Sequence, residues 1–170
     1  MLEKLLDIRL LAFDMDGVLT NGKLLMSSTG EWERVMDIKD GYALQAAVKS
    51  GLIVVVLTGS FSEPISSRLK HLGITHFIQH VSDKVEAIKM LLSEFSLTQD
   101  QILYMGDDIP DIPLLKMVGL AACPSDSSVD VLQNTNYQSP LKGGEGCVRE
   151  IMEQVMRVQE KWMKDLAFEW

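Results

Sequence analysis

The chain contains a series of short apolar runs, and these limit the possible folds more than any other feature of the sequence. Four runs, at 8–13, 52–57, 102–105 and 118–122, are almost continuously apolar, and a weaker one lies at 74–78. A strand with one solvated face alternates apolar and polar residues, whereas a strand covered on both faces does not. We therefore predict the buried strands of a parallel sheet.

Helical patterns separate these runs. The segments 41–51 and 62–73 both end at a glycine, a common helix stop, and 82–95 has apolar residues at helical spacing behind Ser82, a candidate cap. Strands that alternate with helices are typical of an α/β fold. The sequence thus predicts a doubly wound parallel sheet.

Two segments depart from this alternation. Residues 23–37 resemble two short strands around a Thr-Gly pair, so we predict a small flap hairpin over about 20–38. The tail predicts one amphipathic helix over about 146–169, which packs on the sheet or meets another subunit. A chain of 170 residues suffices for one core, and we predict a single domain, 1–170.

Charge and cysteine content exclude some classes of protein. The net charge of −8, from 16 basic and 24 acidic residues, argues against sequence-independent nucleic-acid binding. A small phosphorylated substrate stays possible, because a bound cation can invert the local field. No apolar run approaches the length of a membrane span. With Cys123 and Cys147 far apart and outside any CxxC motif, we predict buried reduced thiols in a cytoplasmic protein without membrane contact.

Acidic, hydroxyl and glycine residues follow the predicted strands, and a lysine begins the third helix. Because ligands bind at the carboxyl ends of the strands in open α/β sheets, we expect these residues to converge at one edge. Glycines there would let the backbone approach a phosphate. The residues are Asp14, Asp16, Thr58, Gly59, Ser60, Lys84, Asp107, Asp108 and Asp111.

Such a set suits phosphoryl transfer. Crowded carboxylates need a cation, and oxygen ligands favour Mg²⁺. Aspartate can attack phosphorus, while Thr58, backbone amides and Lys84 are the donor types that a phosphoryl group needs. The simpler alternative is that some of these acids only cap helices, which we keep open for Asp108 and Asp111.

Four motifs carry a family resemblance. DMDGVLT (14–20), LTGS (57–60), the lysine of SDK (82–84) and GDDIPD (106–111) resemble, in order, motifs one to four of the haloacid dehalogenase (HAD) superfamily. The first motif alone would be weak, but all four in order are specific.

The resemblance implies a role for each matching residue. Asp14 would be the nucleophile, and Asp16 the general acid and base that also lends a backbone carbonyl to the metal. Thr58 would hold the phosphate and Lys84 would neutralise the phospho-aspartate. Magnesium would be held by Asp14, Asp16 and Asp107, with Asp111 orienting its waters and Asp108 a candidate partner of Lys84.

The spacing of the motifs leaves no room for a cap domain. Capless HAD enzymes include the 3-deoxy-D-manno-octulosonate 8-phosphate (KDO 8-phosphate) phosphatases of lipopolysaccharide biosynthesis, which this chain resembles in TGE (29–31), KDGY (39–42), LGITH (72–76) and GGEGCVREI (143–151). That resemblance implies a homotetramer in which the flap hairpin helps to close a neighbour's site. It also implies substrate contacts from Thr20, Gly59, Ser60 and Arg68, where Arg68 meets a carboxylate or is simply a solvated helix residue.

Two positions depart from that group. Ser60 and Glu145 stand where those phosphatases usually have arginine, and GGEG resembles enzymes that act on nine-carbon sugar acid 9-phosphates. The expected function is a magnesium-dependent phosphomonoester hydrolase that releases KDO and phosphate. The alternatives are a phosphatase of 2-keto-3-deoxynonulosonate (KDN) or N-acetylneuraminate 9-phosphate, and a non-catalytic binding module with a HAD fold.

Overall fold

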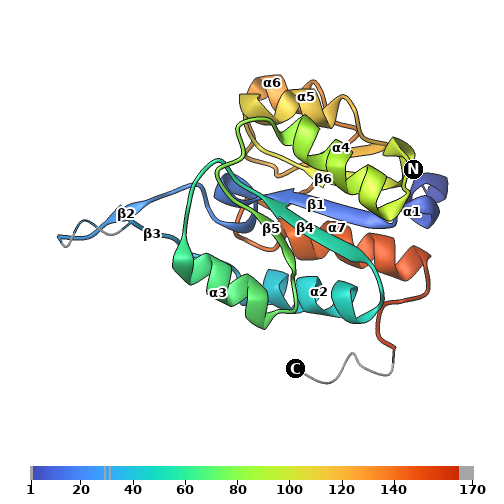
Figure 1. Ribbon diagram of the computed structural model, residues 1–170, viewed down its shortest axis with the longest axis horizontal. Coiled ribbons are helices and arrows are strands. Elements are labelled where there is room, and N and C mark those ends of the chain that lie inside the picture. Colours follow the sequence, from blue (N-terminus) through green and yellow to red (C-terminus); the bar gives the residue numbers. More distant parts are fainter. Residues whose placement is uncertain (1, 29, 31, 165–170) are drawn as a thin grey trace.

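The computed structural model describes residues 2–28, 30 and 32–164. Its centre is a parallel sheet of six strands in the order β5-β4-β1-β6-β7-β8 (Figure 1). The five predicted strands are confirmed, and a two-residue sixth strand, too short to give a sequence signal, completes one edge. The strands are β1 (Leu10–Asp14), β4 (Ile53–Leu57), β5 (His76–Ile78), β6 (Ile102–Met105), β7 (Leu120–Cys123) and β8 (Tyr137–Gln138).

Helices cover both faces of this sheet, which confirms the doubly wound α/β fold (Figure 1). The helices of one face are α1 (Leu2–Asp7), α2 (Ile38–Lys49), α3 (Glu63–His71) and α7 (Cys147–Val158). Those of the other face are α4 (Lys84–Phe95), α5 (Ile112–Leu115) and α6 (Val129–Leu132).

Alternate residues of the central strand β1 enter two different cores. Leu11 and Phe13 pack with α2 and α7, whereas Leu10 and Ala12 pack with the α4 side, and none of the four is exposed to solvent. Both faces of the strand are therefore apolar, which explains why the run in the sequence does not alternate.

The helix starts differ from prediction in two places. α2 begins at Ile38, three residues earlier than predicted, because the side chain of Asp37 accepts hydrogen bonds from the backbone N–H groups of Lys39 and Asp40. Asp83, and not Ser82, caps α4 by accepting from the backbone N–H groups of its first turn. A carboxylate is well placed there because it faces the positive end of the helix dipole.

The predicted C-terminal helix is wrong beyond Val158, where α7 ends. Glu160 takes a left-handed backbone conformation, with φ of 56°, and the N–H groups of Lys161 and Trp162 both donate to the carbonyl of Met156, so the chain folds back at the helix end. Trp162 is buried against α2, with its ring edge-on to Tyr42 at a centroid distance of 5.9 Å. The remainder of the prediction, 165–169, lies outside the described residues.

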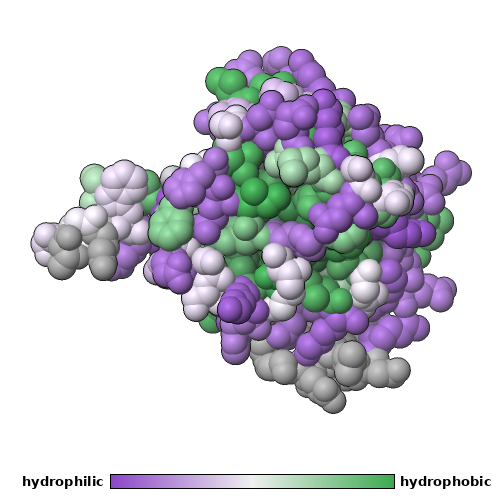
Figure 2. All heavy atoms as spheres, in the orientation of Figure 1, coloured by the Kyte–Doolittle hydropathy of each residue, from purple (hydrophilic) through white to green (hydrophobic). Residues whose placement is uncertain are grey.

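The flap hairpin follows β1 as predicted. In it, β2 (Leu25–Met26) pairs antiparallel with β3 (Trp32–Glu33), and a bridge between Thr20 and Met36 closes its base. Figure 2 shows this hairpin projecting from the body of the molecule with apolar and pale side chains at its surface. Leu25, Met26 and Trp32 are 66%, 74% and 61% exposed.

Two further sequence predictions concern membrane-spanning segments and thiols. Over the described ranges, none of the helices combines the length and the apolar character that a bilayer crossing requires. Cys123 and Cys147 are both buried and free, as predicted.

Candidate active site

A pocket of about 420 Å³ lies at the carboxyl ends of the strands, where the sequence places the chemistry. Asp14 is the last residue of β1, Thr58 directly follows β4, and Asp107 lies two residues beyond β6. Since β1 pairs in parallel with both β4 and β6, their ends meet at one edge. Every predicted site residue except Thr20 and Arg68 lines this pocket.

The turn after β1 is held by Thr20. Its hydroxyl oxygen accepts hydrogen bonds from the backbone N–H groups of Gly17 and Gly22, and its own N–H donates to the carbonyl of Met15. Thr20 is fully buried in this position, so the structure does not bring it to the pocket.

Only glycine fits at position 17 of this turn. Gly17 has φ of 88°, and a β-carbon there would lie 2.0 Å from Oδ2 of Asp107. The turn and the strand end that carries Asp107 are therefore packed directly against each other.

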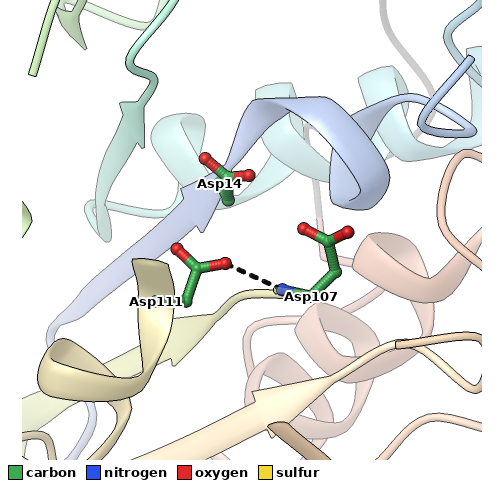
Figure 3. Close-up of side chains that lie close together, drawn as sticks. All are labelled: Asp14, Asp107 and Asp111. Atoms are coloured by element: carbon green, nitrogen blue, oxygen red, sulfur yellow. Dashed lines mark hydrogen bonds between the residues drawn. The ribbon is translucent and has the colours of Figure 1, made fainter. Parts of the chain in front are cut away.

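Three carboxyl groups face one another across the pocket (Figure 3). Asp14, Asp107 and Asp111 each offer an oxygen within 4.8 Å of the others. Asp111 is fixed by its own loop, because Oδ2 accepts from the backbone N–H groups of Asp107 at 2.9 Å and Asp108 at 3.2 Å. The hydroxyl of Tyr104 on β6 donates to Asp111 Oδ1 at 2.6 Å.

Lys84, at the start of α4, joins two of these acids. Its Nζ lies 2.6 Å from Asp14 Oδ1 and 2.5 Å from Asp111 Oδ1. Burial alone would lower the pKa of Lys84, but Asp14 and Asp111 outweigh it and raise the pKa. Among the described residues Lys84 forms no ion pair with Asp108, which is exposed and is the N-cap of the 3₁₀ turn Ile109–Asp111.

One lysine does not neutralise the cluster. Burial, with the added repulsion of Asp111, raises the pKa of Asp14 to about 6 even though Lys84 opposes the shift. Burial and then the charges of Asp14 and Asp111 raise the pKa of Asp107 to about 8. A crowded set of carboxylate oxygens is the donor set of a divalent cation, so the residues present fit a metal ion.

The side chain of Asp16 points to a different partner. Arg34, in the flap hairpin, donates from Nε to Asp16 Oδ1 at 2.6 Å and from Nη2 to Oδ2 at 3.2 Å. The Ser60 hydroxyl donates to Asp16 Oδ2 at 3.1 Å and lies 3.0 Å from the Thr58 hydroxyl. The Arg34 side chain is only 5% exposed.

Sequence reasoning missed Arg34. The available signal was a basic residue between the apolar Trp32 and Val35 in a hairpin that follows the nucleophile motif.

Two other positions that the sequence analysis singled out, Arg68 and Glu145, lie away from the pocket. The guanidinium of Arg68 lies against Gly41 of α2, where a β-carbon would be 3.1 Å from Nη2, and Glu145 is exposed.

The glycines before α7 contact the turn after β1. A β-carbon on Gly143 would lie 1.9 Å from the carbonyl oxygen of Gly17, and Gly144 donates its N–H to the carbonyl of Val18 at 2.9 Å. The C-terminal part of the chain thus supports the turn that carries Asp14 and Asp16.

Comparison with known proteins identifies this arrangement. A family model described as haloacid dehalogenase-like hydrolase matches residues 65–151, about half of the chain. The KDO 8-phosphate phosphatase of Yersinia pestis is 34% identical over 160 residues, 94% of this chain and 86% of that protein. The Escherichia coli K12 enzyme of the same name is 34% identical over 91% of this chain and 82% of its own. This chain belongs to the haloacid dehalogenase-like hydrolases. Within them it is a member of the KDO 8-phosphate phosphatase family.

Solved structures place this hydrolase in the same family. The Yersinia pestis phosphatase has a TM-score of 0.91 at 34% identity, over 94% of this chain and 86% of that one. The Moraxella catarrhalis phosphatase, in complex with a magnesium ion, a phosphate ion and KDO, has a TM-score of 0.91 at 31% identity, over 95% of this chain and 92% of that one. The cobalt-bound Haemophilus influenzae enzyme has a TM-score of 0.89 at 28% identity, over 97% of this chain and 98% of that one.

Proposed function

We propose that this hydrolase is a magnesium-dependent phosphatase that cleaves KDO 8-phosphate through an aspartyl-phosphate on Asp14. The observation that carries the proposal is the contact of Lys84 with Asp14 and Asp111 beside Asp107, at the strand ends. The names of the relatives, and the magnesium, phosphate and KDO in the Moraxella catarrhalis structure, support the substrate and the metal.

The chain's own residues would act in two steps. Asp14, whose Oδ1 is held by Lys84, attacks phosphorus. The bond from phosphorus to the sugar oxygen breaks as Asp16 gives that oxygen a proton. Asp16 then takes a proton from the water that attacks the phospho-aspartate, which releases phosphate and regenerates Asp14. The Thr58 hydroxyl and the Gly59 and Ser60 amides are donors for the phosphoryl oxygens at the same edge of the pocket.

Asp14, Asp107 and the backbone carbonyl of Asp16 would hold the magnesium, and Asp111 would orient its waters or bind it directly. When bound, magnesium offsets the charge of these carboxylates and of the phosphoryl group. Asp111 suits either role because its backbone hydrogen bonds fix its position beside Asp14 and Asp107.

A nine-carbon substrate, KDN or N-acetylneuraminate 9-phosphate, is the second candidate. It is favoured by Glu145 in the GGEG segment and by the absence of an arginine at position 60. A non-catalytic module is disfavoured because Asp14, Lys84 and Asp107 are all present and grouped.

The decisive assay is phosphate release from eight- and nine-carbon 2-keto-3-deoxy sugar acid phosphates with Mg²⁺. We expect the highest kcat/KM with KDO 8-phosphate and a loss of about a thousandfold or more in Asp14→Asn. Asp130→Asn, on the exposed face of α6, is the matched control and should keep full activity. Turnover of neither substrate length contradicts the substrate, and full activity of Asp14→Asn contradicts the mechanism.

We also propose a homotetramer in which each flap hairpin completes a neighbour's site. Its support is that three large apolar side chains, Leu25, Met26 and Trp32, are exposed together on one hairpin, as is common at protein–protein contacts. Light scattering at micromolar concentration should give a tetrameric mass that Trp32→Ala reduces. Met90→Ala, which is 74% exposed but on α4, should not change it. A monomeric wild type contradicts the assembly.

We further propose that residues 1–170 act as one domain, because both cores share the single central sheet. A cytoplasmic location is supported by the two buried free thiols. Limited proteolysis giving two stable fragments would contradict the first proposal, and fractionation with periplasmic markers would contradict the second.

A further inference from the structure

The contact between Arg34 and Asp16 conflicts with the acid–base work assigned to Asp16. The guanidinium of Arg34 directs N–H donors at both carboxylate oxygens, at 2.6 Å and 3.2 Å. The Ser60 hydroxyl is the third donor to this carboxylate and contacts Oδ2. A proton carried on either oxygen would meet these N–H groups instead of a leaving group. Arg34 therefore has to release Asp16 before the sugar oxygen can be protonated.

A guanidinium released from one carboxylate needs an equivalent partner, since Arg34 is nearly buried. The planar fork of arginine matches another carboxylate in the same bidentate manner. We propose that Arg34 exchanges partners during the reaction, leaving Asp16 for the carboxylate of the sugar acid substrate. This inference rests on the proposed function, since it requires a substrate that carries both a phosphate and a carboxylate.

The flap hairpin gives Arg34 the means to move. Only two residues on each strand, Leu25–Met26 and Trp32–Glu33, form the hairpin's ladder, and both strands are exposed. Arg34 lies between this ladder and the bridge at Met36. A ladder of only two residue pairs, separate from the central sheet, is a weak part of a fold, so the segment that carries Arg34 can shift without disturbing the sheet.

Ser60 allows the exchange to free only one oxygen of Asp16. Its hydroxyl donates to Oδ2 at 3.1 Å independently of Arg34, so the departure of Arg34 frees Oδ1 and leaves Oδ2 hydrogen-bonded. A short side chain at this position also leaves the space that the guanidinium occupies, since Arg34 Nη2 lies 3.3 Å from Ser60 Oγ.

Two other cations that the sequence suggested for the site have other neighbours. Lys84 is held by Asp14 and Asp111, and the Arg68 guanidinium lies against Gly41 on α2. In this proposal Arg34 distinguishes a sugar acid from a neutral sugar. A phosphate ester without a carboxylate leaves the fork on Asp16 and reacts slowly.

The test compares KDO 8-phosphate with its C1 carboxamide, which has the same shape without the charge. Wild type should prefer the acid by about ten- to a hundredfold in kcat/KM, as expected for a charged hydrogen-bonded pair. Arg34→Met should bring this ratio close to one, because the carboxamide reacts faster once Asp16 is no longer held and the acid loses the partner of its carboxylate. Arg34→Lys, which keeps the charge without the fork, should give an intermediate ratio.

The control removes an arginine that is remote from the site. Arg157→Met, on α7 where Arg157 pairs with Glu153, should keep the wild-type ratio. If Arg34 merely orients Asp16, both substrates lose activity equally and the unchanged ratio overturns the exchange while the phosphatase function stands. If wild type does not hydrolyse the acid, both proposals fall. Should Arg34→Met not fold, as judged by its thermal melt, a wild-type ratio in Arg34→Lys overturns the exchange.

Discussion

The buried carboxylate of Asp40 on α2 accepts a hydrogen bond, 2.6 Å long, from the backbone N–H of Arg149 in the first turn of α7. Its second oxygen, Oδ2, is buried without a hydrogen-bond partner among the described residues. Burial raises the pKa of Asp40 to about 6, against the opposing effect of the Arg149 N–H. The contact therefore joins two packed helices but costs stability when Asp40 is ionised.

We predict that Asp40→Asn gains stability relative to wild type as the pH rises. The folded pKa, about 6, exceeds the ordinary value of 3.8, so the contribution of Asp40 is fully present below 3.8 and is lost as pH rises through about 6. Urea unfolding at about pH 5 and about pH 8 should show the difference between variant and wild type shifting by about 1 kcal/mol in favour of the variant.

The exposed Asp130→Asn is the control for the loss of one carboxylate from the chain. A difference for Asp40→Asn that is the same at both pH values, or that moves the other way, contradicts the prediction.

Metal binding should release protons. The pKa of Asp107 is raised to about 8 by burial and by its acidic neighbours, so its carboxyl is protonated over much of the neutral range and has to ionise to bind a cation. We expect the affinity for Mg²⁺ to increase by up to about tenfold per pH unit between about pH 6 and pH 8. Calorimetry in buffers of different ionisation enthalpy measures the proton count, and a Kd independent of pH argues against it.

Asp111 should matter more than its hydrogen-bond partner Tyr104. Asp111→Asn loses the ion pair with Lys84 and weakens the metal site, so kcat/KM and Mg²⁺ affinity should each fall by about ten- to a hundredfold. Tyr104→Phe removes one donor to Asp111 and should cost about 1 kcal/mol of stability, while kcat/KM and the affinity for Mg²⁺ stay close to those of wild type. Equal effects of the two variants on metal affinity would show that Asp111 has no special role.

Gly17→Ala should damage the site by collision. Its β-carbon would lie 2.0 Å from Asp107 Oδ2, so Asp107 has to move and turnover should fall about a hundredfold or more. Gly51→Ala is matched in conformation, with φ of 81° against 88°, but meets nothing within 4 Å. It should cost only about 1–2 kcal/mol in unfolding experiments and keep full activity.

Strand-end residues could be predicted from sequence because the chemistry there follows from topology. Continuous apolar runs indicate parallel strands, and parallel strands bring Asp14, Thr58 and Asp107 to one edge whatever their separation in the chain. The same reasoning could not place Arg34, whose reach depends on how far a hairpin leans over the sheet. Nor could it give the direction of Arg68, because helical spacing assigns a face but not the path of a long side chain.

The end of α7 escaped prediction for a local reason. Its apolar pattern continues past Val158, and no glycine or proline marks a stop, so the amphipathic period extends the helix. Burial of Trp162 on α2 offsets the cost of the left-handed conformation of Glu160. This contact involves a helix that is distant in the sequence, so the local pattern does not reveal it.

The tight approach of Gly143 to the carbonyl of Gly17 ties the last quarter of the chain to the first motif. Neither position tolerates a side chain, because a β-carbon on Gly143 would meet the carbonyl of Gly17 and one on Gly17 would meet Asp107. Grafting the first motif onto a foreign scaffold would therefore fail unless the glycine loop before α7 were transferred with it. The smallest transferable unit of this site is discontinuous in sequence.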